Sequence, residues 1–113
     1  MTFTRPDIKP LVIDTASASS NALVSAIAGK RVRVYGIWIQ AAGTVTITFE
    51  DDDGTNLTGA ITLNARETVE WYPLSNGKGE WLPYLVTQQG DGFNMLLSDA
   101  VQVSGTFWYS QED

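Results

Sequence analysis

Apolar and polar side chains alternate along much of the chain, which is the period of half-buried β-strands. The clearest runs are residues 31–40 and 44–51, which are rich in β-branched and aromatic residues and are separated by Ala-Ala-Gly. Two such runs joined by a short glycine-containing turn predict a β-hairpin. Val45, Ile47 and Phe49 share one face of the second run, and threonines occupy the other. The second strand is therefore expected to bury one side only.

The first of these runs changes its alternation near Gly36. Val32 and Val34 alternate with arginines, whereas residues 37–39 are all apolar. A glycine inside a strand often marks a β-bulge, and a bulge moves the alternation by one residue. Either a bulge at this point or burial of both faces is expected.

Further short strands are expected about every eight to twelve residues. Residues 22–28 contain alanine and leucine, which favour a helix, but their short length before Gly29 favours a strand and a turn. Asn76 with the following glycine predicts a tight turn, and Pro83 predicts an edge or irregular strand. The other expected strands are residues 11–14, 56–63, 67–72, 81–87, 93–97 and 101–109. This spacing predicts an all-β fold, an antiparallel jelly-roll-like sandwich or barrel of about eight short strands.

Length and proline content predict one domain preceded by an arm. The chain has 113 residues, which is near the commonest domain size. Pro6 and Pro10 disfavour a helix at the N-terminus. We expect residues 1–13 to form an extended N-terminal arm and a first short strand, and residues 14–113 to form a single β-domain.

Composition argues against most catalytic and charged-partner functions. The chain has no Cys and no His, so common nucleophile, general-base and zinc-site designs are missing. Its net charge of −6 disfavours nucleic acid and anionic lipid. No apolar run approaches the roughly 20 residues of a membrane span, and the N-terminus shows no secretory signal. We therefore expect no enzyme, no cofactor, no metal, no direct nucleic-acid contact and no membrane contact.

The acidic run from Glu50 to Gly54 is the candidate cation site. Asp51, Asp52 and Asp53 are consecutive, so their side chains diverge along the backbone. Calcium loops instead place carboxylates at alternate positions. We expect a solvated hairpin tip that discourages edge pairing, with a weak calcium site as the alternative.

Aromatic side chains are the best candidates for an interaction surface. Adjacent rings, as at Trp71-Tyr72 and Trp108-Tyr109, must point to opposite faces of a strand. The outward ring is either covered by a loop, buried in a partner interface, or stacked on a sugar. The candidate partner-interface residues, three of them from the arm, are Phe3, Arg5, Ile8, Trp71, Tyr72, Trp81 and Tyr84.

Four segments carry a family resemblance: residues 21–34 (NALVSAIAGKRVRV), 41–49 (AAGTVTITF), 57–60 (LTGA) and 92–105 (GFNMLLSDAVQVSG). In order and strand phase they resemble small phage and prophage virion structural proteins with a jelly-roll-like β fold. The proline-containing arm and the Trp-rich residues 71–84 depart from that pattern. Since the hairpin of residues 30–54 is expected to anchor the fold, partner contacts are expected in the arm and in residues 71–84.

The resemblance implies a capsid decoration protein, made in the host cytoplasm and located in the virion. Such a protein would bind the head surface as a homo-oligomer, with a trimer favoured, and stabilise it. Its partners would be the major capsid protein or other virion subunits. A neck or tail structural protein and a carbohydrate-binding β module, for which a glycan would be the ligand, are the alternatives.

Overall fold

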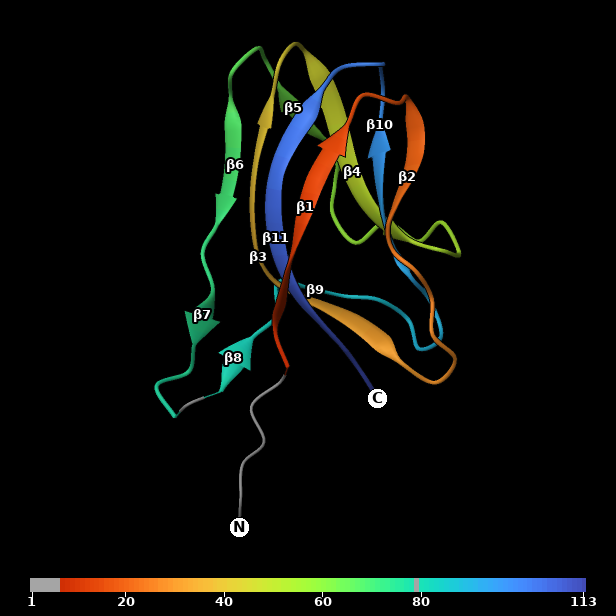
Figure 1. Cartoon of the computed structure of the whole chain (residues 1–113), viewed down its shortest axis with the longest axis vertical. Helices are drawn as coiled ribbons and strands as arrows, with labels where there is room; N and C mark the ends of the chain where they lie inside the picture. The colour runs from red at the N-terminus through yellow and green to blue at the C-terminus, as the bar shows by residue number, and fades with distance from the viewer. Residues whose placement is uncertain (1–6, 79) are drawn as a thin grey trace.

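The computed structural model describes residues 7–78 and 80–113, which form eleven β-strands and no helix (Figure 1). Every pairing between strands is antiparallel. Two sheets enclose one apolar core as an open sandwich. The expectation of an all-β antiparallel fold is confirmed, and the alternative of a closed barrel is wrong.

The first sheet has the strand order β1-β11-β3-β6, and β9 also pairs with β3. Its strands are β1 (Lys9–Thr15), β11 (Val103–Glu112), β3 (Arg31–Ala41), β6 (Thr68–Trp71) and β9 (Leu85–Val86). The second sheet has the order β2-β10-β4-β5. Its strands are β2 (Ser19–Val24), β10 (Phe93–Leu97), β4 (Val45–Asp51) and β5 (Ile61–Leu63). A third, two-stranded sheet pairs β7 (Leu74–Ser75) with β8 (Trp81–Leu82).

The number of strands exceeds the expected eight because residues 71–86 break into short pieces. Pro73 ends β6, and Pro83 separates β8 from β9. A proline has no N–H to donate to a ladder, which explains both interruptions. Residues 19–24 form a strand, so the choice of strand over helix for this part of the chain is confirmed.

The expected hairpin between β3 and β4 is wrong, because the two strands lie in different sheets. Their linker bonds elsewhere: the N–H of Ala42 donates to the carbonyl of Gln102 at 2.9 Å, and the N–H of Arg66 donates to the carbonyl of Ala41 at 2.7 Å. The chain therefore arches over the core. The buried sides of β3 and β4 face each other across it instead of lying side by side.

The expected bulge in β3 is confirmed. Trp108 lies opposite Gly36 and Tyr109 opposite Val34, so Tyr35 is the extra residue. On either side of it Val34 and Ile37 are both buried. Tyr35 is itself buried, and its hydroxyl lies 3.1 Å from the hydroxyl of Ser110. The bulge thus lets β3 keep one side in the core along its full length.

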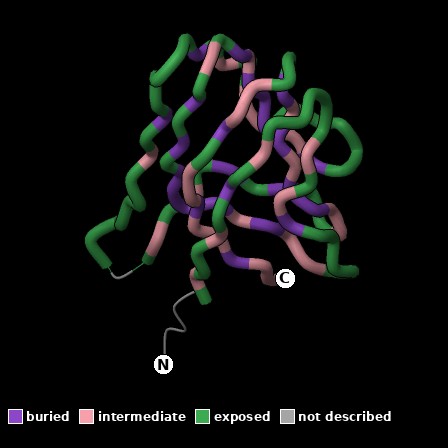
Figure 2. Tube along the Cα trace, turned by 45° about the horizontal axis from the view of Figure 1, so that its top comes forward, coloured by how far each residue is buried: buried purple, intermediate pink, exposed green. Residues whose placement is uncertain are grey.

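Aromatic rings contact one another across the core between the two sheets. Figure 2 colours the buried residues of this core purple. Phe49 of β4 and Phe93 of β10 stack with their ring centroids 5.5 Å apart. The ring of Phe93 also packs against the ring of Phe107 on β11, in the opposite sheet, with their centroids 5.6 Å apart. All three side chains are fully buried.

Gly105 of β11 allows the backbones of β11 and β3 to approach each other closely. A β-carbon at this position would overlap the carbonyl oxygen of Trp38 and lie 2.8 Å from the Cα of Ile39. We expect Gly105→Ala to lower the free energy of unfolding by about 1–3 kcal/mol, because the β-carbon would meet backbone atoms of β3, which cannot move aside as a flexible side chain can. The measurement is urea denaturation followed by tryptophan fluorescence.

Gly59→Ala is the matched control, because a β-carbon there meets nothing within 4 Å. We expect it to leave stability unchanged or to raise it by about 0.4–1 kcal/mol. Equal unfolding midpoints for the two variants would contradict the close approach at Gly105.

Candidate functional site

The hairpin of β7 and β8 extends away from the sandwich (Figure 1) and is mostly exposed (Figure 2). Residues 76–80 join the two strands, and Gly77 has the positive φ, 82°, that the expected turn requires. The N–H of Asn76 donates to the carbonyl of Glu80 at 3.1 Å, and its Oδ1 accepts from the N–H of Lys78 at 2.7 Å. The hairpin therefore orders its own tip by local hydrogen bonds.

Exposed apolar side chains concentrate on this hairpin and the short strand that follows. Four of the eight large hydrophobic residues exposed in the described chain lie within residues 74–86. Leu74 and Leu82 lie directly opposite each other and are 49% and 44% exposed. A two-stranded hairpin is at best marginally stable alone, and exposed apolar surface adds a cost in water. We call Leu74, Trp81, Leu82, Tyr84 and Val86 the hairpin surface.

Trp71 fixes the base of the hairpin rather than facing solvent. Its ring stacks on Tyr84, with centroids 5.4 Å apart and an interplanar angle of 19°, and contacts Phe49 at 6.0 Å. The hydroxyl of Tyr84 donates to the carbonyl of Tyr72 at 2.7 Å. Tyr72 points the other way and is 68% exposed. The adjacent pair therefore divides between the core and the surface.

The remaining candidate interface residues are spread over the molecule. Trp81 is half-buried on β8, and Ile8 is half-buried just before β1. Phe3 and Arg5 lie outside the described residues. Trp81 thus lies on β8, Tyr84 lies between β8 and β9, and Ile8 lies at the start of the first sheet.

Several exposed apolar residues were not expected from the sequence. Leu74, Leu82 and Val86 belong to strands of only two residues, which are too short for alternation to reveal. Trp38, 45% exposed, lies in the part of β3 where the alternation was ambiguous. Placing the bulge at Tyr35 would have predicted that Trp38 points outward.

The acidic run is only partly a solvated tip. Asp51 is buried, and its Oδ1 accepts from the N–H groups of Asp53 and Thr55, both at 3.1 Å. Asp52 accepts from the N–H of Gly92 at 2.8 Å and from the side-chain amide of Asn94 at 3.1 Å. The expectation of a fully solvated tip is wrong, because two of the carboxylates hold turns and loops together.

No group of three or more His, Cys, Asp or Glu side chains within residues 7–78 and 80–113 could hold a metal ion. Asp91 nevertheless faces this acidic run, and one of its carboxylate oxygens is buried without a hydrogen-bond partner. Loss of surrounding water, and then the negative charge of Asp53 and Asp51, raise the pKa of Asp91. At neutral pH the negative charges of this cluster therefore repel one another and destabilise the folded state.

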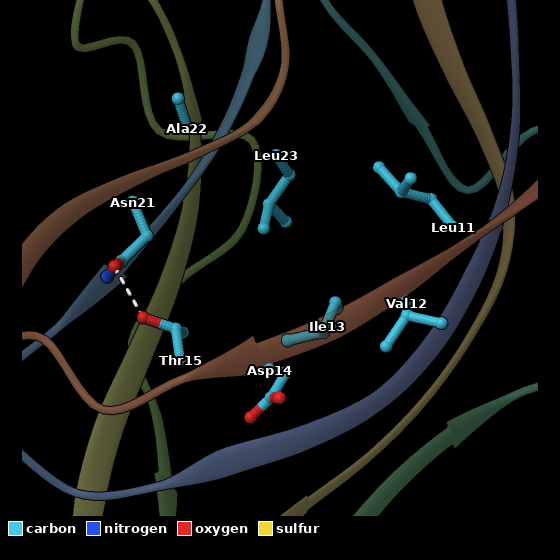
Figure 3. A pocket seen from close by; sticks show the side chains of 8 residues that line it. All are labelled: Leu11, Val12, Ile13, Asp14, Thr15, Asn21, Ala22 and Leu23. Carbon is cyan, nitrogen blue, oxygen red and sulfur yellow. Dashed lines mark hydrogen bonds between the residues drawn. The ribbon is translucent and has the colours of Figure 1, made fainter.

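A groove of about 380 Å³ lies between the edge strands β1 and β2 (Figure 3). A hydrogen bond of 2.7 Å from the hydroxyl of Thr15 to the amide oxygen of Asn21 joins its walls. Leu11 and Leu23 supply apolar lining, and Asp14 is the ionisable group among its lining residues. The groove marks the open side of the sandwich and brings no set of catalytic groups together.

The variant Asp91→Asn tests whether the charge of Asp91 destabilises the folded protein. Because folding raises the pKa of Asp91, its contribution to stability is full at low pH and is lost as pH rises through the folded value. We expect the variant to have a higher urea midpoint than the parent at pH 7. This advantage should vanish as pH falls through about 4, where carboxylates ordinarily protonate.

Asp7→Asn is the control, since Asp7 is 82% exposed and its ion pair with Lys9, at 3.6 Å, is of a kind that contributes little. It should shift the midpoint little at any pH. An advantage of Asp91→Asn that stayed constant from neutral to acid pH would show that charge is not its cause.

Comparison of the chain with protein-family models, curated proteins and solved structures found no match. In the part of the chain that the structure describes, no helix is long and apolar enough to span a membrane.

Proposed function

We propose that the protein is a non-enzymatic phage virion structural protein that decorates the capsid head. In this proposal it acts as a homotrimer and docks on the major capsid protein through the hairpin surface. The observation that carries the proposal is the concentration of exposed apolar side chains on an element that projects from the sandwich. The family resemblance of the sequence supplies the virion setting.

The order of the strands supports the finer proposal of a jelly-roll fold. The ladders nest: β1 pairs with β11, β2 with β10, β3 with β6, and β4 with β5. This is the pairing of one long hairpin, folded over and wrapped into two sheets. Jelly rolls occur in viral capsid and lectin domains, although a fold alone does not fix function.

Burial of the hairpin surface would supply the attachment energy. Leu74 and Leu82 leave about half of their surface in water, and full burial of such a side chain contributes about 1.5–3 kcal/mol. A single small contact of this kind is weak. Many copies on one lattice, linked within trimers, would add their contacts by avidity.

The arm would supply a second contact in this proposal. β1 begins at Lys9 and pairs with β11 along its whole length. Only residues before Lys9 can therefore be deleted without removing part of the first sheet. Ile8 is partly buried beside that boundary, and Phe3 and Arg5 precede it. A neck or tail location would use the same surfaces on a different virion subunit.

Light scattering of the isolated protein tests the oligomeric state. We expect a mass three times that of the chain. Each copy has only one small attachment surface, so copies must be linked to one another for their weak contacts to add up to stable binding. Deletion of residues 1–6 should leave both this mass and the unfolding midpoint unchanged. A monomer over the full accessible range of concentration would contradict the proposed trimer.

The double variant Leu74→Ser/Leu82→Ser tests the docking surface. When it is co-expressed with the capsid proteins of its own virus, we expect at least a tenfold loss of occupancy on purified particles, measured by gel densitometry; tenfold corresponds to about 1.4 kcal/mol. Both positions are exposed, so the unfolding midpoint of the variant should change little.

Ile27→Ser is the matched control, because Ile27 is 45% exposed on a loop away from the hairpin. Its occupancy should equal that of the parent. Equal occupancy for the double variant would instead remove the hairpin from the proposed attachment surface.

A further inference from the structure

The outer face of the first sheet presents a row of residues in register across four strands. Val12 lies opposite Thr106, which lies opposite Trp38, which lies opposite Glu70. Residues in register share one face of a sheet. Val12 is 71% exposed and Trp38 is 45% exposed. The row therefore places a large, partly exposed aromatic ring on a central strand of the outer sheet face.

A neighbouring row extends this aromatic surface. Pro10 lies opposite Trp108, and Trp108 lies opposite Gly36. A β-carbon on Gly36 would lie only 3.1 Å from Cδ of Pro73, so the missing side chain lets the proline ring pack close to the sheet. Tyr72 directly precedes this proline, and its side chain is 68% exposed. We call the side chains of Pro10, Val12, Trp38, Tyr72 and Trp108 the aromatic strip, with the Pro73 ring packed against Gly36 beside it.

Tyr72 and Glu70 form a fixed polar pair beside this strip. The hydroxyl of Tyr72 donates to Oε2 of Glu70 at 2.7 Å. This bond, and then the charge of Glu70, raise the pKa of Tyr72. The second carboxylate oxygen of Glu70 accepts from the hydroxyl of Thr68 at 3.3 Å. A carboxylate held in this way can still accept hydrogen bonds from a ligand.

The row on the other side of Trp38 is entirely polar. Asp14, Ser104, Gln40 and Thr68 lie in register across the same four strands. They present a carboxylate, an amide and two hydroxyls, and none of the three rows contains Lys or Arg. The aromatic strip is therefore bordered by hydrogen-bonding groups that carry either no charge or a negative one.

We propose that this outer face binds a neutral carbohydrate chain. Flat, exposed aromatic rings stack on the apolar faces of pyranose rings, and amide, hydroxyl and carboxylate groups bond the hydroxyls along the ring edges. Negative charge without a basic side chain disfavours a phosphate or sulfate ligand. Trp38 is the central stacking platform, and Tyr72 and Trp108 extend it.

The size of the strip favours a sugar over a second copy of the chain. A stable dimer interface buries about 800 Å² per partner over 20–30 residues. The strip offers five apolar side chains, Pro10, Val12, Trp38, Tyr72 and Trp108, bordered by a polar row. Such a surface matches the width of an extended glycan chain better than the apolar centre of a protein interface. The site does not depend on the docking role proposed for the hairpin surface.

The test uses the full chain on an array of neutral gluco-, manno- and galacto-hexasaccharides, followed by calorimetry with the best ligand. Trp38→Ala should weaken binding at least tenfold, about 1.4 kcal/mol, and Trp38→Phe should retain part of it. Raising the salt concentration about tenfold should leave affinity unchanged, because the ligand is uncharged. Trp81→Ala, which changes the hairpin instead, is the control and should bind like the parent.

Three results would overturn the proposal. One is the absence of binding tighter than about 1 mM to every glycan on the array. A second is equal binding by Trp38→Ala and the parent. The third is a change in oligomer mass in Trp38→Ala without glycan binding by the parent, which would assign this face to a subunit contact. Unfolding midpoints measured for each variant separate these outcomes from misfolding.

Discussion

A continuous series of ring contacts joins the two sheets, and the rest of the structure depends on it. Phe93 stacks on Phe49 within the second sheet and touches Phe107 of the first. Phe49 also touches Trp71, and Trp71 stacks on Tyr84. Each such pair contributes about 0.5–1.5 kcal/mol beyond the burial of its area. The same contacts that close the core therefore also hold the base of the projecting hairpin.

Alternation in the sequence identifies which side of a strand is buried but not which strand lies next to it. β4 buries Val45, Ile47 and Phe49, as its pattern predicts. The same pattern is satisfied whether β4 pairs with β3 or faces it across a core. The outcome depends on β11, which is far away in sequence and pairs with β3 over ten positions. A long-range ladder of this kind leaves no local signal, so the expected hairpin was wrong. The buried side of β4 was predicted correctly, although Thr48 on its other side is buried as well.

The surface was harder to predict than the core for the same reason. Adjacent rings must divide between two faces, but the sequence does not say which of them enters the core. Trp71 enters because Phe49 and Tyr84 offer it ring contacts, and Tyr72 is left outside. Trp38 lies outside because the bulge at Tyr35 turns Ile37 and Ile39 inward. The placement of Trp71 depends on tertiary contacts with no local signal, whereas that of Trp38 depends on the exact position of a bulge that the local pattern located only approximately.

The hairpin surface and the outer sheet face meet at the Trp71-Tyr72 dipeptide, yet different constraints fix them. Stacking against the core holds Trp71 and, through Tyr84, the hairpin. The ladder between β3 and β11 and the hydrogen bond of Tyr72 to Glu70 hold the sheet face. Exposed side chains take part in both sets of contacts, Tyr84 in the first and Tyr72 in the second. Substitutions of Leu74 and Leu82 on the hairpin, or of Trp38 on the sheet face, touch neither set of ring stacks and hydrogen bonds. Under the two proposals, one small β-domain would present a projecting apolar element to a protein partner and keep its outer aromatic sheet face free for a second ligand.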